Sequence, residues 1–264
     1  MIAEERRSTI LEKLNDAGIV KASELKKIFN VSGETLRKDF ELLEKEGLLK
    51  RIHGGARAKE LVNTSSSKGS IVPFDLRMSQ NIGLKQQIAL AAAALVKEGQ
   101  SVGLDSGTTS LEIAKILKRN FKNLTIVTNS LATTVELMGK KGFSVICTGG
   151  LLTCDEHSFV SELATIVLGR LNLDIMFLTT CGISITAGIT DQRLEEVLVH
   201  KKMASISKKV IVAADSTKFG AVSLVRVCNL ADIDMIITDS AIDEAVYSKY
   251  KAGFGKEIVI AAQE

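Results

Sequence analysis

The feature that most constrains the fold is a series of short apolar runs, separated by helical patterns, that fills the chain from about residue 100 onward. The runs read SVGLD, LTIVTN, FSVICTGG, IMFLTTCG, VIVAAD, MIITD and EIVIAA. Strand-like runs that alternate with amphipathic helices are typical of βαβ units, so the sequence predicts an α/β domain with a largely parallel sheet. Several runs end in acid, amide, glycine or hydroxyl residues. Open α/β sheets bind ligands at this carboxyl edge.

The stretch LDSGTTSLEIA joins the first run to a helical pattern. A strand that ends at Asp105 and a helix that starts near Ser110 leave residues 106–109 as the connecting turn. Its glycine allows close backbone approach, and its hydroxyls lie beside the unpaired N–H groups of the helix start. This combination suits a phosphate group, and it also suits a plain helix cap without a ligand. Dinucleotide and nucleoside-triphosphate motifs are absent from the sequence, so a small phosphorylated metabolite is favoured.

The first sixty residues carry three short helical patterns. Ser23 and Ser32 are expected to cap the second and third helices, with a tight turn between these helices at residues 30–31. This is helix-turn-helix spacing, in which the third helix enters the major groove and LLKRIHGGARA forms a basic wing; a solvated helical hairpin is the alternative. The side chains expected to face inward are Ile10, Leu11, Leu14, Leu25, Ile28, Phe29, Leu36, Phe40 and Leu43. The residues expected at DNA are Ser23, Ser32, Gly33, Thr35, Arg37, Lys38, Lys50, Arg51, His53 and Arg57.

A polar segment separates these helical patterns from the predicted sheet. The stretch AKELVNTSSSKGS is rich in small residues and the only proline, Pro73, follows it, which is typical of a linker. We therefore expect a winged helix-turn-helix domain at 1–57, a linker at 58–72 and a second domain at 73–264. The net charge of +3 permits a nucleic-acid partner without arguing for one.

Composition excludes several classes of protein. The 4 cysteines include no C-x-x-C pair and the 3 histidines form no metal set, so we expect no disulfide framework, no metal and no cofactor. The longest apolar run, IALAAAALV, is too short to span a bilayer, and the first ten residues are too charged for a signal peptide. We expect a cytoplasmic protein without a membrane partner.

The stretch VSGETLRKDFELLEKEGLLKRIHGGA closely resembles the amino-terminal signature of DeoR-type transcriptional regulators. The chain also carries, in matching order, LKQQIA, LDSGTT, TIVTNS, TGG, AGIT, ADSTKFG and IITD, which resemble the signatures of that family's effector domain. The resemblance implies a winged helix-turn-helix joined to a domain similar in fold to ribose-5-phosphate isomerase and glucosamine-6-phosphate deaminase. It also implies a repressor of a sugar-utilisation operon that a phosphorylated sugar releases from operator DNA.

The resemblance carries a set of effector-binding residues onto this chain. They comprise turn residues at strand ends, two lysines near family motifs and two acids suited to sugar hydroxyls. Of the lysines, Lys218 is favoured because it lies just beyond a strand end. Alternatively, the two acids have no ligand and are simply a helix-start acid and a surface glutamate. The set is Lys85, Asp105, Ser106, Gly107, Thr108, Thr109, Thr128, Asn129, Ser130, Gly149, Gly150, Asp191, Glu195 and Lys218.

Two positions depart from the family pattern. Thr180 and Cys181 stand where the family usually has an alanine and an acid, which removes a hydroxyl acceptor and a negative charge. Ser161 stands where the family commonly has glycine. The identity of the sugar phosphate therefore cannot be taken over from relatives.

Other functions remain open from the sequence. A sugar-phosphate isomerase or deaminase would use Asp105 or Asp215 as a general base, although an enzyme has no need of a DNA-binding domain. An activator with the same architecture is a further alternative. Because one helix-turn-helix contacts only a few base pairs, we expect a homo-oligomer, either a dimer or a tetramer.

Overall fold

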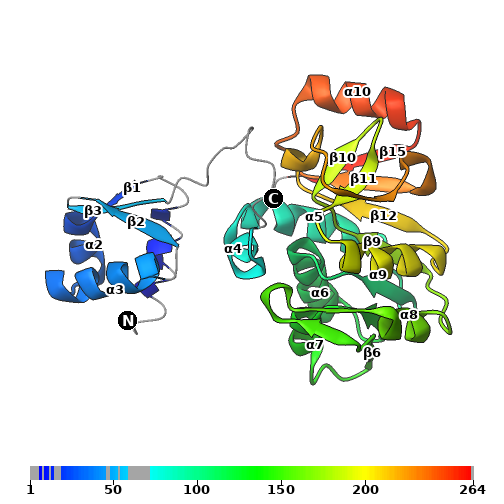
Figure 1. Cartoon of the computed structure of the whole chain (residues 1–264), viewed down its shortest axis with the longest axis horizontal. Helices are drawn as coiled ribbons and strands as arrows, with labels where there is room; N and C mark the ends of the chain where they lie inside the picture. The colour runs from blue at the N-terminus through cyan, green and yellow to red at the C-terminus, as the bar shows by residue number, and fades with distance from the viewer. Residues whose placement is uncertain are drawn as a thin grey trace. The chain divides into compact units, whose positions relative to one another are not determined.

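The chain folds into two compact units, Met1–Val72 and Pro73–Glu264, which are described separately and called the amino-terminal unit and the sheet unit (Figure 1). The structure is a computed structural model. It describes residues 6–7, 9–11, 13–14, 19–45, 48–52, 54–58 and 72–262.

The amino-terminal unit packs helices against a small antiparallel sheet. Strands lie in the order β1, β3, β2, and the described residues between 6 and 14 are helical. The turn between α2 and α3 passes through Asn30, which adopts the left-handed conformation that asparagine tolerates. The predicted winged helix-turn-helix is thus present. Its elements are β1 (Ile19–Lys21), α2 (Ala22–Phe29), α3 (Gly33–Lys45), β2 (Leu49–Ile52) and β3 (Gly55–Ala58).

Two predictions for α2 were wrong. Ser23 does not cap this helix, because β1 runs directly into it: Lys21 holds the cap position, and the backbone N–H of Ala22 donates to the carbonyl of Gly54 (2.8 Å). Ile28 does not face inward, since its side chain is 55% exposed. The other inward positions are correct: Leu11 is partly buried, and the core contains Ile10, Leu14, Leu25, Phe29, Leu36, Phe40 and Leu43.

The sheet unit is built on one parallel sheet. Among the described residues, seven strands lie in the order β15, β14, β12, β9, β4, β5, β6, and every neighbouring pair is parallel. These strands are the seven apolar runs, so the predicted fold class is confirmed. The strands are β4 (Ser101–Leu104), β5 (Leu124–Thr128), β6 (Phe143–Cys147), β9 (Ile175–Leu178), β12 (Val210–Ala213), β14 (Met235–Thr238) and β15 (Glu257–Ile260).

Helices cover both faces of this sheet, because successive strand residues point to opposite sides. On β12, Ile211 packs in one hydrophobic cluster with α5 and α6, whereas Val212 packs in the other with α8, α9 and α10. Both sets of helices are visible around the sheet in Figure 1. The helices are α4 (Phe74–Ser79), α5 (Ile82–Ala93), α6 (Thr108–Asn120), α7 (Leu131–Leu137), α8 (Glu162–Leu168), α9 (Leu194–Ser205) and α10 (Glu244–Phe254).

Short antiparallel strands, which the sequence analysis did not predict, surround the carboxyl edge. Strands β10, β11 and β13 form one small sheet, and β7 and β8 form a hairpin. The bounds are β7 (Leu151–Thr153), β8 (Ser158–Val160), β10 (Gly182–Ser184), β11 (Gly188–Asp191) and β13 (Val225–Cys228), with short 3-10 helices η1 (Cys154–Glu156), η2 (Ser216–Lys218) and η3 (Leu230–Asp232).

The described helices contain no stretch with the length and apolar character required to cross a membrane. In the same part of the chain, histidine, cysteine and acidic side chains do not gather into a group that could hold a metal ion.

Candidate functional site

The start of α3 presents a polar, solvent-exposed surface. The Ser32 hydroxyl accepts a hydrogen bond from the backbone N–H of Thr35 (3.1 Å), so this serine caps α3 as predicted. Gly33, Arg37 and Lys38 are exposed around this cap, and the Arg37 side chain is 63% exposed. The Arg37 guanidinium lies near acids of its own helix, 3.4 Å from Glu34 among them. A helix start of this kind can contact base edges when it lies in the major groove.

The wing is joined to α3 by one arginine. The Arg51 backbone N–H and guanidinium both donate to Glu44 (2.8 and 2.6 Å), and the guanidinium also reaches Glu41 (2.9 Å). The two hydrogen bonds that Glu44 accepts from Arg51 lower the pKa of Glu44. Arg51 therefore ties the wing to α3, and its side chain is 40% exposed. A shallow hollow lies between the wing and α3, lined by residues including Gly33, Arg37, Arg51 and Gly54.

The remaining DNA-binding predictions have varied positions. Lys50 is exposed on β2, Arg57 is partly buried on β3, and His53 lies outside the described residues. A buried ion pair was not predicted from the sequence. The Arg6 guanidinium donates two hydrogen bonds to Asp39 (2.6 and 3.1 Å) and ties the first helical residues to α3. Asp39 falls at a core-facing position of α3, which is the signal that could have identified it.

In the sheet unit, Asp105 follows β4 and bonds to the residue that follows β9. These are the two strands between which the direction of strand addition reverses. From β4 the chain builds β5 and β6 on one side and then continues with β9 on the other, which makes the β4–β9 junction a topological switch point. The buried Asp105 carboxylate accepts hydrogen bonds from the backbone N–H of Thr179 (2.5 Å) and from Ser110 Oγ (2.6 Å). It also accepts one from the N–H of Gly107 (3.0 Å). Asp105 thus positions the turn, and its oxygens are occupied.

Gly107 is required by this junction. A Cβ atom at Gly107 would lie 1.9 Å from Thr179 Oγ1, so only glycine fits without a shift of Thr179. Within the described part of the chain, α6 begins at Thr108 without a side-chain cap, and Ser106, Thr108 and Thr109 are largely buried beside its first N–H groups. Such a helix start can bind an anion.

Asn129 links the second turn to the first. Its Nδ2 lies 3.4 Å from Ser106 Oγ and 3.3 Å from the carbonyl of Phe159. Its Oδ1 is buried and accepts no hydrogen bond from any described residue. The neighbouring side chains serve the backbone instead: Thr128 accepts from the N–H of Ser130, and Ser130 caps α7. Of the three predicted residues here, Asn129 is the one with a buried acceptor atom that has no partner in the described part of the chain.

The third turn depends on glycine. Gly149 and Gly150 have φ of 63° and 108°, and a Cβ at Gly150 would meet the Val160 carbonyl at 2.5 Å. Opposite them, Ser161 has φ 97° and ψ 169°, a conformation that residues other than glycine rarely adopt. Its hydroxyl is buried and bonds to none of the described residues. The position flagged from the sequence as an unusual serine is therefore a strained one.

The two predicted lysines both lie near Asp215. Lys85 is buried, its ammonium donates to the carbonyl of Arg77, and burial lowers its pKa to about 8 against the opposing effect of Asp215. Lys218 lies 4.0 Å from the Asp215 carboxylate and is partly exposed. The structure therefore brings both lysines to one end of the sheet.

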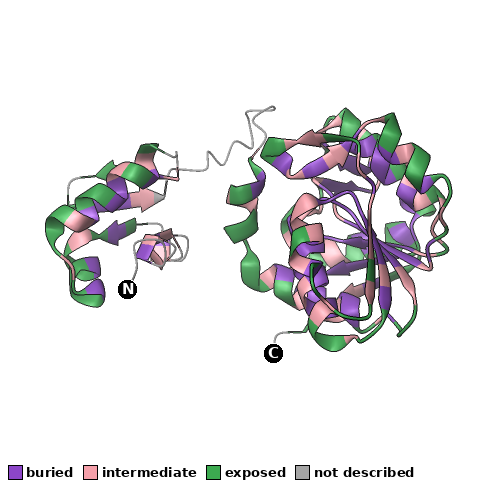
Figure 2. Ribbon diagram, turned by 90° about the horizontal axis from the view of Figure 1, so that it is seen from below, coloured by how far each residue is buried: buried purple, intermediate pink, exposed green. Residues whose placement is uncertain are grey.

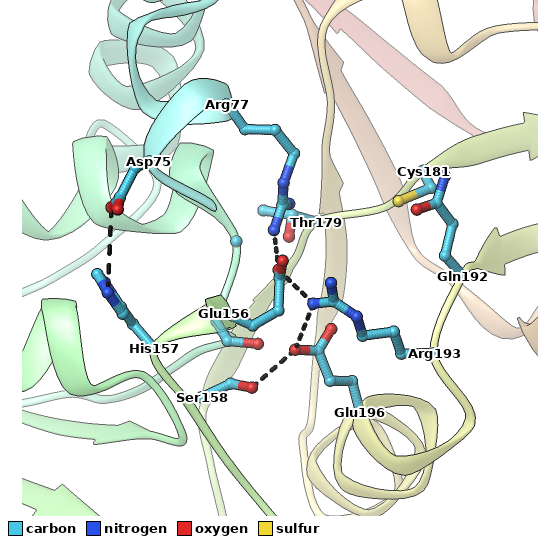
Figure 3. Close-up of polar contacts among 12 residues, drawn as sticks. Asp75, Arg77, Glu156, His157, Ser158, Thr179, Cys181, Gln192, Arg193 and Glu196 are labelled. Carbon is cyan, nitrogen blue, oxygen red and sulfur yellow. Dashed lines mark hydrogen bonds and ion pairs between the residues drawn. The ribbon is translucent and has the colours of Figure 1, made fainter. Parts of the chain in front are cut away.

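Two arginines that sequence reasoning missed converge on one buried acid (Figure 3). Arg77 from α4 and Arg193, which immediately precedes α9, both bind Glu156 Oε2, the latter at 2.6 Å. Glu156 Oε1 has no partner among the described residues. Glu196 continues the network, 3.8 Å from Arg193 and 2.7 Å from Ser158 Oγ. These residues carry no local motif and meet only through the fold.

The two predicted acids differ in position. Asp191 is buried and accepts hydrogen bonds from the N–H of Gln192 (2.7 Å) and from the thiol of Cys181 (3.3 Å). Burial and Asp191 raise the pKa of Cys181 to about 12, so the thiol stays neutral and is a poor redox sensor. Glu195 is exposed on the outside of α9, and Glu196 occupies the buried position next to it.

Comparisons with known proteins cover both units. Residues 6–61 match the family model of the DeoR-like helix-turn-helix domain, and residues 80–240 match that of the DeoR C terminal sensor domain. The HTH-type transcriptional regulator GolR of Listeria innocua is 32% identical over 247 residues, 94% of either chain. The transcriptional repressor AccR of Agrobacterium fabrum is 34% identical over 238 residues, 90% of either chain. A solved ribose 5-phosphate isomerase of Methanocaldococcus jannaschii aligns with 53% of this chain and 55% of its own, at 17% identity and a TM-score of 0.40.

Proposed function

The chain belongs to the DeoR family of helix-turn-helix transcriptional regulators, and from this membership we propose that it represses transcription at an operator and leaves the DNA when a phosphorylated sugar binds to the sheet unit. Repression, as opposed to activation, is proposed from the family resemblance and from the name of the relative AccR. In this proposal, α3 and the wing contact the operator, and the carboxyl edge of β4, β5 and β9 binds the effector.

The observation that carries the effector site is the buried Oδ1 of Asn129, which has no partner among the described residues, beside the start of α6, which no described side chain caps. A buried acceptor without a partner costs free energy, about 1–3 kcal/mol, unless a donor reaches it. A sugar hydroxyl is such a donor, while the α6 N–H groups suit the phosphate of the same molecule. The two halves of a sugar phosphate thus match two adjacent features of the turn.

The buried ammonium of Lys85 supports an anionic ligand at the same edge. Desolvation disfavours its charged form, and Lys218 and Arg77 add like charge. A phosphate dianion nearby would stabilise all three cations. Lys85 is held by the Arg77 carbonyl of α4, the first helix of the sheet unit.

The alternative of a sugar-phosphate isomerase requires a free general base. The Asp105 carboxylate accepts hydrogen bonds from both the turn and Thr179, which follows β9, so a catalytic role would require these to break. An absorbance assay of sugar-phosphate turnover, run beside a gel-shift with the protein's own upstream DNA, separates the two functions. Turnover without retardation of DNA would favour the enzyme.

The effector site is tested by calorimetric titration of a panel of sugar phosphates. We expect one to bind the native protein and to bind Thr108→Asp about tenfold or more weakly, because the added carboxylate repels the phosphate. Ser144→Asp is the matched control, since Ser144 is exposed near the amino end of β6, at the opposite edge of the sheet. Equal affinity for all three proteins would refute the site.

The switch is tested by operator binding with and without the sugar phosphate found by titration. By thermodynamic reciprocity, a ligand that weakens operator binding must bind the operator complex less tightly, with a coupling of roughly 1–3 kcal/mol. Fluorescence anisotropy of labelled operator DNA measures this coupling. A sugar phosphate that binds at the Thr108 turn and leaves operator affinity unchanged would refute the switch but not the site.

A further inference from the structure

Two neighbouring helices of the sheet unit present apolar side chains to solvent. On α8, Leu163 and Ile166 are 63% and 59% exposed, and on α9 Leu194 and Leu198 are 59% and 50% exposed. The helices are in contact with each other and lie side by side in Figure 1. We call these four residues together with Val167 the outer face.

The fold of a single chain does not require the outer face. The opposite sides of the same helices supply the core, with Ala164 and Leu168 from α8 and Val197 and Met203 from α9. Figure 2 shows the alternation of buried and exposed residues on the helices around the sheet. The outer apolar residues follow helical spacing at i, i+3 and i+4, so each helix carries a second apolar stripe.

The exposed apolar area is large enough to form the centre of an interface. With roughly 180 Å² for a fully exposed aliphatic residue, the outer face leaves about 500 Å² in water, near the top of the range for single patches on monomers. A charged rim would extend this area toward the roughly 800 Å² that each partner contributes to a standard interface.

The charges at the ends of both helices favour a second copy of this chain as the partner. Each helix has an exposed acid in its first turn, Glu162 on α8 and Glu195 on α9. Exposed basic residues lie at the other ends, Arg170 just after α8 and Lys201 toward the end of α9. If two α9 helices cross in antiparallel fashion at Leu198, Glu195 of each copy faces Lys201 of the other. Such self-complementarity is the property of a two-fold interface.

We propose that the outer face is the surface through which two copies of this chain form a two-fold dimer, with α9 packed antiparallel on its counterpart. A dimer supplies the two helix-turn-helix units that paired half-sites need. The proposal goes beyond the effector function and does not depend on it. It also gives α9 two roles, because Arg193 at its start binds Glu156 in the cluster near the proposed effector site.

The face is tested by sedimentation velocity of the full chain over a series of concentrations. Leu198→Asp and Leu163→Asp should each raise the dimer dissociation constant about 100-fold or more, because each places two unpaired charges in an apolar interface. Val135→Asp on α7 is the matched control, since Val135 is 59% exposed on another helix, and it should leave dimerisation unchanged. Unchanged circular dichroism and melting temperature verify that all variants fold.

The antiparallel arrangement is tested by charge reversal. Glu195→Lys and Lys201→Glu should each weaken the dimer about tenfold, because each creates two like-charge contacts, and the double variant should restore it. A native chain that stays monomeric, or a dimer unaffected by either aspartate variant, would overturn the proposed face. Single variants that weaken the dimer without recovery in the double variant would overturn the two-fold pairing. None of these results depends on effector binding, so they remain distinct from a failure of the proposed switch.

Discussion

Replacement of Ser161 by glycine should stabilise the sheet unit. Ser161 precedes α8 with φ 97° and ψ 169°, where its Cβ crowds the backbone. Its hydroxyl is buried and hydrogen-bonds to no residue in the described part of the chain. The side chain therefore adds strain and an unsatisfied polar group, and glycine removes both.

The expected change in the free energy of unfolding follows from two stabilising contributions and one that opposes them. A residue held in this region costs about 1–3 kcal/mol, and the unpaired hydroxyl adds about 1 kcal/mol. Glycine gives back about 0.5–1 kcal/mol through the greater freedom of the unfolded chain. The free energy of unfolding should thus rise by about 1–3.5 kcal/mol, which corresponds to an increase of about 2–14 °C in melting temperature for a unit of this size.

The assay is thermal and urea unfolding of the full chain, followed by far-ultraviolet circular dichroism. Ser161→Ala is the control, because it removes the hydroxyl and keeps the Cβ atom, so it should show only the smaller part of the gain. A Ser161→Gly protein no more stable than Ser161→Ala would refute the assignment of strain to this backbone position.

Three further predictions concern the DNA contacts and the effector site. Arg37→Ala should weaken operator binding by about 1–3 kcal/mol and spare nonspecific DNA, whereas Lys50→Ala should weaken binding to all sequences and flatten its salt dependence, as measured by anisotropy. Sugar-phosphate affinity should fall as pH rises through about 8, because Lys85 with its pKa lowered to about 8 loses its charge there while the phosphate stays a dianion; calorimetry should show a flat profile for Lys85→Gln over the same range. Gly107→Ala should destabilise the sheet unit by about 1–3 kcal/mol in urea unfolding through its clash with the Thr179 side chain, whereas Gly83→Ala, which has open space for a Cβ, should not destabilise it.

The parallel sheet could be predicted because its signal is local. Each central strand is a continuous apolar run, and each run ends in a residue suited to a turn, such as Asp105 or Asn129. The antiparallel strands gave no such signal, since β10 and β11 are short and contain glycine at their starts. The apolar stripes of the amino-terminal helices were equally local signals. The inward-facing residues predicted from them were correct except for Ile28, at the margin of its stripe.

The candidate site was predictable only where one turn contains its residues. Residues 105–109 are contiguous and could be identified as a helix start. The convergence of Arg77 and Arg193 on Glu156 joins residues separated by more than thirty positions in sequence, through a hairpin that was not predicted. Isolated charged residues of this kind are usually solvated, so nothing in their local pattern distinguishes them.

Helix α9 shows why one sequence position can decide a residue's role. In LEEVLVH, Glu195 and Glu196 are equivalent by composition, yet their side chains leave the helix about 100° apart, so one is exposed and the other is buried beside Ser158. The same segment has apolar residues on two sides, Val197 toward the core and Leu198 toward solvent. A helix that is apolar on more than one side is expected to be buried on more than one side. In the single chain that condition is met on one side of α9, and the two-fold dimer proposed above would meet it on the other.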